Sequence, residues 1–247
     1  MKILAINNYS LNECMEKIHS GTMPAQHAWG CDYLKAHGHD VTTLTYNSHK
    51  GRILKQIDLF LFSLKNLSRF NHYDVVISFC NSTIGWAALF KRIGFLHCKM
   101  YTLVHHHTSR FMWLNNGFDR IFFLSKQVMD FTKQDYPLLA EKMIYLEWGP
   151  DLDFYNDSFR QMEQRHNPPV VMISNGKTWR DIDLIEVACK QLNIPLIVIT
   201  DKAKNSSSSI VSSGTEGKNA ILDSTLLTYM SQSTISLIPI KNKSHND

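Results

Sequence analysis

Short apolar runs alternate with stretches of helical periodicity along most of this 247-residue chain, and this alternation constrains its fold more than any other feature. Residues 74–79 form an almost continuous apolar run, which is typical of a strand covered on both faces in a parallel sheet. Residues 53–67 place their apolar side chains at helical spacing. The repeated strand–helix–strand order predicts an α/β protein with a parallel, doubly wound sheet.

The first part of the chain predicts a complete set of such units. Strands are expected at residues 2–6, 41–46, 74–79, 100–104, 120–124 and 142–146. Helices are expected at residues 24–36, 53–67, 84–93 and 126–134. Pro24 at the start of the first of these and Gly38 after its end fit the preference for proline early and glycine late in helices.

The pattern breaks near residue 150, and the polar segment "NDSFRQMEQRHNPP" indicates a linker or an element that precedes one. Strands are expected again at 170–174, 195–200 and 235–240, with helices at 179–192 and 223–231. The serine-rich "KNSSSSIVSSGTEG" predicts a surface loop. We therefore predict two Rossmann-like domains, residues 1–165 and 166–247. The second has about three strands and is incomplete, because sheets usually carry about four to six.

Charge and cysteine content narrow the class of protein. The net charge is +4, without a run of lysine or arginine, which suits an anionic small ligand or a weak contact with a membrane surface and argues against nucleic acid. Five isolated cysteines without a C-x-x-C pair are typical of a reduced, cytosolic protein. We find neither a signal-peptide core nor an uncharged apolar run of about 18 residues, so a cytoplasmic protein is expected.

The loop "SNGKTWRD" connects the strand expected at 170–174 to the following helix. Thr178, three residues before Asp181, predicts a capped helix start beside Gly176 and Lys177. Free backbone N–H groups at a helix start, together with Lys177 and Arg180, favour a bound phosphate. A role in the turn and in solubility is the alternative. The loop is neither a Walker A motif nor G-x-G-x-x-G, which disfavours P-loop and NAD-binding proteins.

Several stretches resemble group 1 (family 4) glycosyltransferases of the GT-B fold. "ISNGKTWRDIDLIEVACKQLNIPLIVIT" is similar to the opening of their C-terminal domain, and "FDRIFFLSKQVMDFTKQDYPLLAEKMIYLEWGPDLDFY" to the end of their N-terminal domain. "SGTMPAQHAWGCDYLKAHGHDVTTLTY" resembles their first loop, helix and strand, and "LTYMSQSTISLIPI" a later helix and strand. The resemblance covers nearly the whole chain in pieces, each of them loose but in the family's order.

The resemblance implies transfer of a sugar from a nucleotide-sugar donor to a glycan or lipid-linked acceptor, in polysaccharide biosynthesis. Retention of configuration and no essential metal or cofactor are implied, with the donor mainly on the C-terminal domain and the acceptor mainly on the N-terminal domain. A location at the inner face of the membrane fits such an acceptor.

Individual residues acquire roles through this resemblance. Lys177 corresponds to a loop cation that is normally arginine, and Arg180 corresponds to a second cation at a shorter spacing than usual. Gly21 and Thr22 correspond to a glycine-rich first loop, in which the family often has two adjacent glycines.

Three consecutive histidines follow the strand expected at 100–104, at the edge where open α/β sheets bind ligands. The resemblance implies that His105 or His106 contacts the donor sugar. A zinc site that uses His105 and His107 lacks a supporting ligand pattern, and ordinary polar loop residues are the other alternative.

Hydrolase chemistry finds no support in the sequence. Asp119 and Asp151 fit caps and turns better than an acid/base pair, and there is no G-x-S-x-G motif.

The glutamate-containing segment that holds the donor in the resembling family has no counterpart before Asp247. We therefore expect either a truncated or compact glycosyltransferase, or a non-catalytic GT-B remnant or binding partner that lacks the distal donor site.

Overall fold

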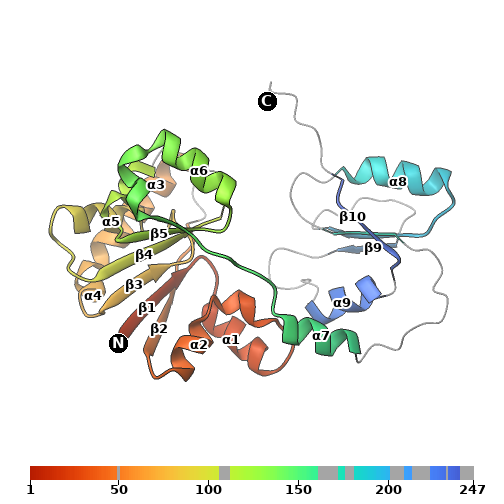
Figure 1. The fold of residues 1–247 in the computed structure, drawn as a ribbon, viewed down its shortest axis with the longest axis horizontal. Helices are drawn as coiled ribbons and strands as arrows, with labels where there is room; N and C mark the ends of the chain where they lie inside the picture. The colour runs from red at the N-terminus through yellow and green to blue at the C-terminus, as the bar shows by residue number, and fades with distance from the viewer. Residues whose placement is uncertain are drawn as a thin grey trace. The chain divides into compact units, whose positions relative to one another are not determined.

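The computed structural model describes residues 1–48, 51–105, 112–160, 172–175, 181–200, 209–212, 223–231 and 233–239 (Figure 1). The chain divides into two compact units. The first consists of Met1–His19 and Ala25–Pro150, and the second of Ser20–Pro24 and Asp151–Asp247. The domain boundary predicted between residues 165 and 166 lies outside the described residues.

A six-stranded parallel sheet in the order β2-β1-β3-β4-β5-β6 forms the centre of the first unit. Its strands are β1 (Lys2–Asn7), β2 (Asp40–Thr45), β3 (Val75–Ser78), β4 (Lys99–Val104), β5 (Arg120–Phe123) and β6 (Met143–Tyr145). Each of the six predicted strands is confirmed, because every bound differs from the prediction by at most one residue.

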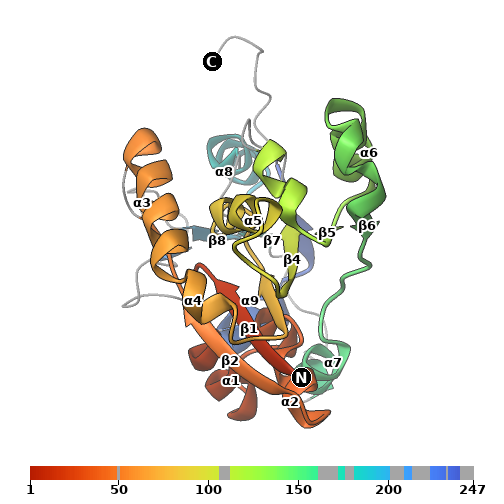
Figure 2. The same ribbon diagram turned by 90° about the vertical axis from the view of Figure 1, so that its left-hand side faces the viewer.

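Helices cover both faces of this sheet, as the apolar runs predicted. The helical elements of the first unit are α1 (Leu11–His19), η1 (Ala25–Ala28), α2 (Cys31–Ala36), α3 (Arg52–Lys65), α4 (Leu67–Phe70), α5 (Gly85–Arg92), η2 (Met112–Gly117), α6 (Lys126–Asp135) and η3 (Pro137–Lys142). α1 and α2 lie on one face and α3 to α6 on the other (Figure 1). Figure 2 shows α5 between α3 and α6.

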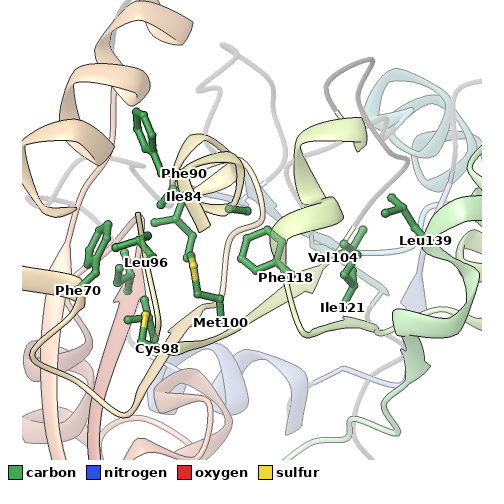
Figure 3. Packing of buried hydrophobic residues seen from close by; sticks show 14 of the residues in the cluster. Phe70, Ile84, Phe90, Leu96, Cys98, Met100, Val104, Phe118, Ile121 and Leu139 are labelled. Atoms are coloured by element: carbon green, nitrogen blue, oxygen red, sulfur yellow. The ribbon is translucent and has the colours of Figure 1, made fainter. Parts of the chain in front are cut away.

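The larger core lies between the sheet and α3 to α6. Met100, Phe118 and Ile121 are fully buried there (Figure 3). A second core that includes Ile3 and Ala5 packs against α1 and α2. Strand β1 contributes alternate side chains to both cores, so each of its residues after Lys2 is buried.

The helix predicted over residues 24–36 is interrupted. A 3₁₀ turn and helix α2 are separated by Trp29 and Gly30, whose φ angles are 53° and 78°. A right-handed helix cannot continue through two successive left-handed residues, so the single helix is a wrong prediction. Helix α1 was not predicted. The helix expected at 53–67 is α3 followed by the short α4.

The second unit contains a four-stranded parallel sheet in the order β10-β7-β8-β9 among the described residues. Its elements are α7 (Leu152–Arg160), β7 (Met172–Asn175), α8 (Ile182–Gln191), β8 (Leu196–Thr200), β9 (Ser209–Ser212), α9 (Asp223–Ser231) and β10 (Ile235–Leu237). The prediction that the serine-rich segment is a loop is therefore wrong in part, because this segment contains strand β9. The β-branched pair Ile210 and Val211 gives this segment strand propensity despite its serines.

Helix α8 begins later than predicted. Its first residue is Ile182, and Asp181 is the N-cap residue, whose side chain accepts a hydrogen bond from Leu184 N at 3.3 Å. The predicted start beside Gly176 and Lys177 is therefore wrong, because the cap is Asp181 rather than Thr178. The loop residues Gly176, Lys177 and Arg180 lie outside the described residues.

Candidate functional site

The strands of the first sheet are all parallel, so their carboxyl ends meet at one edge of the sheet. Phe79 follows β3, His105 follows β4, and Trp148 lies three residues after β6. This edge is where open α/β sheets bind ligands. The chain thus brings aromatic and histidine side chains to the edge at which a site is expected.

Trp29 is the centre of an aromatic cluster at this edge. Its ring stacks on Phe79 and on Trp148, with centroid distances of 5.7 Å in both cases. His105 meets the same ring edge-on, with its centroid 5.0 Å away. Trp148 remains 49% exposed, so its ring is available to a ligand. Such contacts hold rings in defined orientations, each worth about 0.5–1.5 kcal/mol beyond burial.

The backbone at Trp29 is held in an uncommon conformation. Its φ of 53° is in the left-handed region, which costs a residue with a Cβ about 1 kcal/mol or more. Trp29 Nε1 donates a hydrogen bond to Tyr9 Oη at 2.6 Å, and Tyr9 Oη donates to the His27 carbonyl at 3.0 Å. Burial raises the pKa of the Tyr9 phenol, so Tyr9 remains a neutral donor near pH 7. These contacts fix the indole over the sheet edge.

A cavity of about 350 Å³ opens beside the cluster. Ile77, Leu103 and Phe122 form part of its wall from the adjacent strands β3, β4 and β5. The full lining is Gln26, Trp29, Gly30, Ile77, Phe79, Leu103, Phe122, Leu146, Trp148 and Gly149. An apolar wall with two indoles suits the C–H face of a sugar ring or an alkyl chain, with polar contact available from Gln26.

His105 lies at the edge where it was predicted. Its Nε2 is 2.7 Å from the Phe79 carbonyl oxygen, which can only accept, so Nε2 carries the proton. This bond orients the imidazole against Trp29. The structure therefore brings His105 to the aromatic cluster, whereas His106 lies outside the described residues.

Gly21 and Thr22 belong to the segment Ser20–Pro24, which groups with the second unit, whereas His105 belongs to the first. Gly21 has a φ of 70°, a conformation that favours glycine. The Thr22 hydroxyl lies 3.0 Å from the Ser20 hydroxyl, within hydrogen-bond distance. Their role toward a donor stays a prediction, as do the roles of Gly176, Lys177 and Arg180.

Asp151 and Asp119 were predicted as caps or turn residues. Asp151 Oδ1 accepts a hydrogen bond from Phe154 N at 3.2 Å, so it caps the start of α7. The Asp119 carboxylate accepts from Met100 N at 2.7 Å and thereby joins the starts of β4 and β5. Both residues have structural partners in the fold.

The sequence prediction missed Trp29, Trp148, Tyr9 and Phe79. One signal was present: the dipeptide Trp-Gly occurs at 29–30 and again at 148–149, each time just outside a regular element. Large aromatic residues in such turns are candidates for a site, since binding residues occur disproportionately on loops that a rigid scaffold positions.

Three general observations concern the described part of the chain. It contains no group of three His, Cys, Asp or Glu side chains that could hold a metal ion. None of its helices combines the length and apolar character needed to cross a membrane. Among the described residues no disulfide joins the five cysteines, and burial raises the pKa of Cys31 to about 12, so this thiol stays protonated.

No protein-family model and no curated protein matches the sequence, but solved structures match the fold. A glycosyltransferase from Rickettsia africae ESF-5 aligns with a TM-score of 0.58 at 14% identity, over 96% of this chain and 72% of that one. The catalytic domain of starch synthase IV from Arabidopsis thaliana aligns with a TM-score of 0.59 at 8% identity, over 97% of this chain and 78% of that one.

The chain has a GT-B fold. The two Rossmann-like units, each built on a parallel sheet, confirm the predicted fold class. At sequence identities of 14% and 8%, these alignments show a similarity of fold alone. Membership of family 4 and the truncation stay predictions.

Proposed function

We propose that this GT-B chain is a glycosyltransferase that transfers a sugar from a nucleotide-sugar donor to a glycan or lipid-linked acceptor. The observation that carries the proposal is the cavity walled by Trp29 and Trp148 at the carboxyl edge of the first sheet. The starch synthase with a similar fold is bound to ADP and to acarbose, a nucleotide and a saccharide. The acceptor occupies the cavity in this proposal.

The donor half of the proposal rests on the basic loop of the second unit. Lys177 and Arg180, with Gly176 permitting close approach, bind the donor diphosphate and stabilise the charge that develops as the glycosidic bond breaks. Gly21 and Thr22 complete the diphosphate contacts, and His105 or His106 contacts the transferred sugar. Transfer proceeds with retention and without a metal or cofactor, in polysaccharide biosynthesis in the cytoplasm.

Donor binding and turnover test the proposal directly. The chain is titrated calorimetrically with UDP-, ADP- and GDP-sugars, and each is then assayed for transfer to octyl glycosides. Lys177→Ala should weaken donor binding about tenfold or more, because charge-assisted hydrogen bonds are worth about 1.5–3 kcal/mol. The control Lys190→Ala, an exposed lysine on α8, should not change it.

The cavity has a matched control of its own. Trp148→Ala should raise the KM for the acceptor glycoside, whereas Trp113→Ala should not, because Trp113 is 47% exposed but does not line the cavity. If every donor fails to bind and no transfer occurs, the alternative of a non-catalytic GT-B remnant or binding partner replaces the enzyme.

We also propose that the chain associates peripherally with the inner face of a membrane through α3. The outer face of this helix exposes large apolar side chains, with Ile53 at 79%. They are Ile53, Leu54, Ile57, Leu61 and Leu64. A helix with apolar residues on its outer as well as its buried face needs a further partner. Lys55 and Lys65 on the same helix favour an anionic lipid surface.

Vesicle sedimentation tests this association. Vesicles with phosphatidylglycerol should retain the native chain and release the variant Ile53→Ser/Ile57→Ser. The control Leu184→Ser/Val187→Ser removes exposed apolar side chains from α8 and should stay bound. Equal retention of both variants would exclude α3 as the contact surface.

A further inference from the structure

A second and larger cavity, of about 610 Å³, lies at the opposite edge of the first sheet. Lys99 begins β4, Arg120 begins β5, and Lys142 directly precedes β6. Parallel strands all begin at the same edge, so the topology collects these cations there. Lys91 and Arg92, in the last turn of α5, complete the basic wall.

The charge of this cavity is strongly unbalanced. Five cationic side chains and one carboxylate, Asp119, line it, which leaves an excess of four positive charges. That excess equals the net charge of +4 of the whole chain. Like charges gathered in one concavity repel one another and attract anions.

Asp119 is already engaged by the protein. It pairs with Lys91, lies 3.6 Å from Lys99 Nζ and accepts a hydrogen bond from Met100 N. Arg120 Nη1 donates to the Asp119 backbone carbonyl, which carries no formal charge. Arg92 and Arg120 are exposed at the cavity and retain guanidinium donors for a ligand.

The effect of the crowded charges is visible at Lys142. Burial lowers the pKa of this amine, and the neighbouring Lys91, Arg92 and Arg120 lower it further against the opposing effect of Asp119. The Lys142 ammonium donates to the Asn116 carbonyl, which holds it in the cavity wall. A bound anion would relieve this repulsion between the cations. Cations on an ordinary solvated surface would not need such an anion.

We propose that this cavity binds a small molecule or headgroup that carries a phosphomonoester or diphosphate. Arg92 and Arg120 supply forked donors that match phosphate oxygens, and Lys99 adds a mobile charge from a side chain that is 66% exposed. Tyr101 offers a ring and a hydroxyl to the rest of the ligand. The site is distinct from the aromatic cavity, because β4, six residues and about 20 Å long, separates the two edges of the sheet.

Calorimetric titration with sodium pyrophosphate, in parallel with sedimentation on phosphatidylcholine vesicles with and without phosphatidic acid, tests the site. The native chain should bind at least one probe, more weakly as NaCl rises. Arg92→Gln/Arg120→Gln should weaken that binding at least tenfold. The charge-matched control Lys35→Gln/Lys190→Gln removes two exposed lysines outside the cavity and should bind as the native chain does.

The two probes distinguish a free phosphate-containing ligand from a lipid headgroup. Pyrophosphate binding that the arginine variant loses assigns a free ligand. Binding confined to phosphatidic acid vesicles assigns a lipid headgroup if the arginine variant loses it, because contact through α3 would persist in that variant. If neither probe binds, or if the arginine and lysine variants behave alike, the proposal is overturned. Circular dichroism melting verifies that each variant folds. If the double variant is unfolded, the single variant Arg92→Gln is used in its place. Neither result depends on glycosyl transfer.

Discussion

Gly117 is a position at which the fold leaves no room for a side chain. A Cβ there would lie 1.6 Å from the Ala88 carbonyl oxygen, an atom of the α5 backbone. We expect Gly117→Ala to lower the free energy of unfolding by about 3 kcal/mol or more, because overpacking against backbone is costly to relieve. Urea denaturation measures the loss.

Gly85→Ala is the matched control for this prediction. Its Cβ would meet Leu114 and Asn115 at 3.8 Å, an ordinary contact, and Gly85 is the first residue of α5. Its stability should change by no more than about 1 kcal/mol. Equal loss in the two variants would contradict the prediction that Gly117, unlike Gly85, has no room for a side chain.

The Asp119 carboxyl makes the stability of the fold depend on pH. Desolvation alone would raise the pKa of this carboxyl, but hydrogen bonds from Lys91 and Met100 and the charges of Lys91 and Lys99 lower it below the usual value. A depressed native pKa stabilises the fold above the unfolded pKa of about 3.9, and this contribution is lost as pH falls through the native pKa. Melting temperatures from pH 7 to pH 2 should decline more steeply for the native chain than for Asp119→Asn. Parallel curves would contradict the prediction.

Residue-level prediction succeeded where local sequence determines position. His105 was predicted at the sheet edge because it directly follows a recognisable strand, and Asp151, predicted as a cap or turn residue, caps α7. The Trp29–Trp148 stack was missed, since these residues are distant in the sequence and meet only after the sheet has formed.

At the scale of elements, helix α6 depends on its first turn. The Ser125 hydroxyl accepts a hydrogen bond from Val128 N at 3.3 Å. Ser125→Ala should destabilise the chain by about 1 kcal/mol, because one backbone donor loses its acceptor. Ser125→Asp should retain stability, as aspartate caps equally well and its charge suits a helix start. Chemical denaturation of both variants measures the difference, and equal loss would mean that the cap contributes nothing.

The strands of the first sheet were predictable because burial on both faces demands uninterrupted apolar runs. Two other features of the fold had weaker signals in the sequence. Strand β9 has only four residues, two of them serine, and lies at the end of its sheet. The break at Trp29 depends on a left-handed tryptophan, a conformation that sequence propensity disfavours and that tertiary contacts maintain.

At the scale of the whole molecule, the described residues of the two units form separate hydrophobic clusters. The described core of the second unit consists of Ile185, Cys189, Leu196 and Val198, whereas two larger clusters flank the sheet of the first unit. The first unit, Met1–His19 and Ala25–Pro150, also has more residues than the second, and a larger domain buries a larger fraction of its surface. We therefore expect calorimetric unfolding in two transitions, with the second unit melting at the lower temperature.

Substitution of one valine in each unit tests which unit unfolds in which transition. Val198 on β8 and Val76 on β3 are each fully buried in a parallel strand, one in each unit. Either valine-to-alanine substitution removes two methyl groups and should cost about 1–3 kcal/mol. Val198→Ala should lower only the first transition and Val76→Ala only the second. A single transition that both variants lower equally would mean that the two units unfold as one cooperative body.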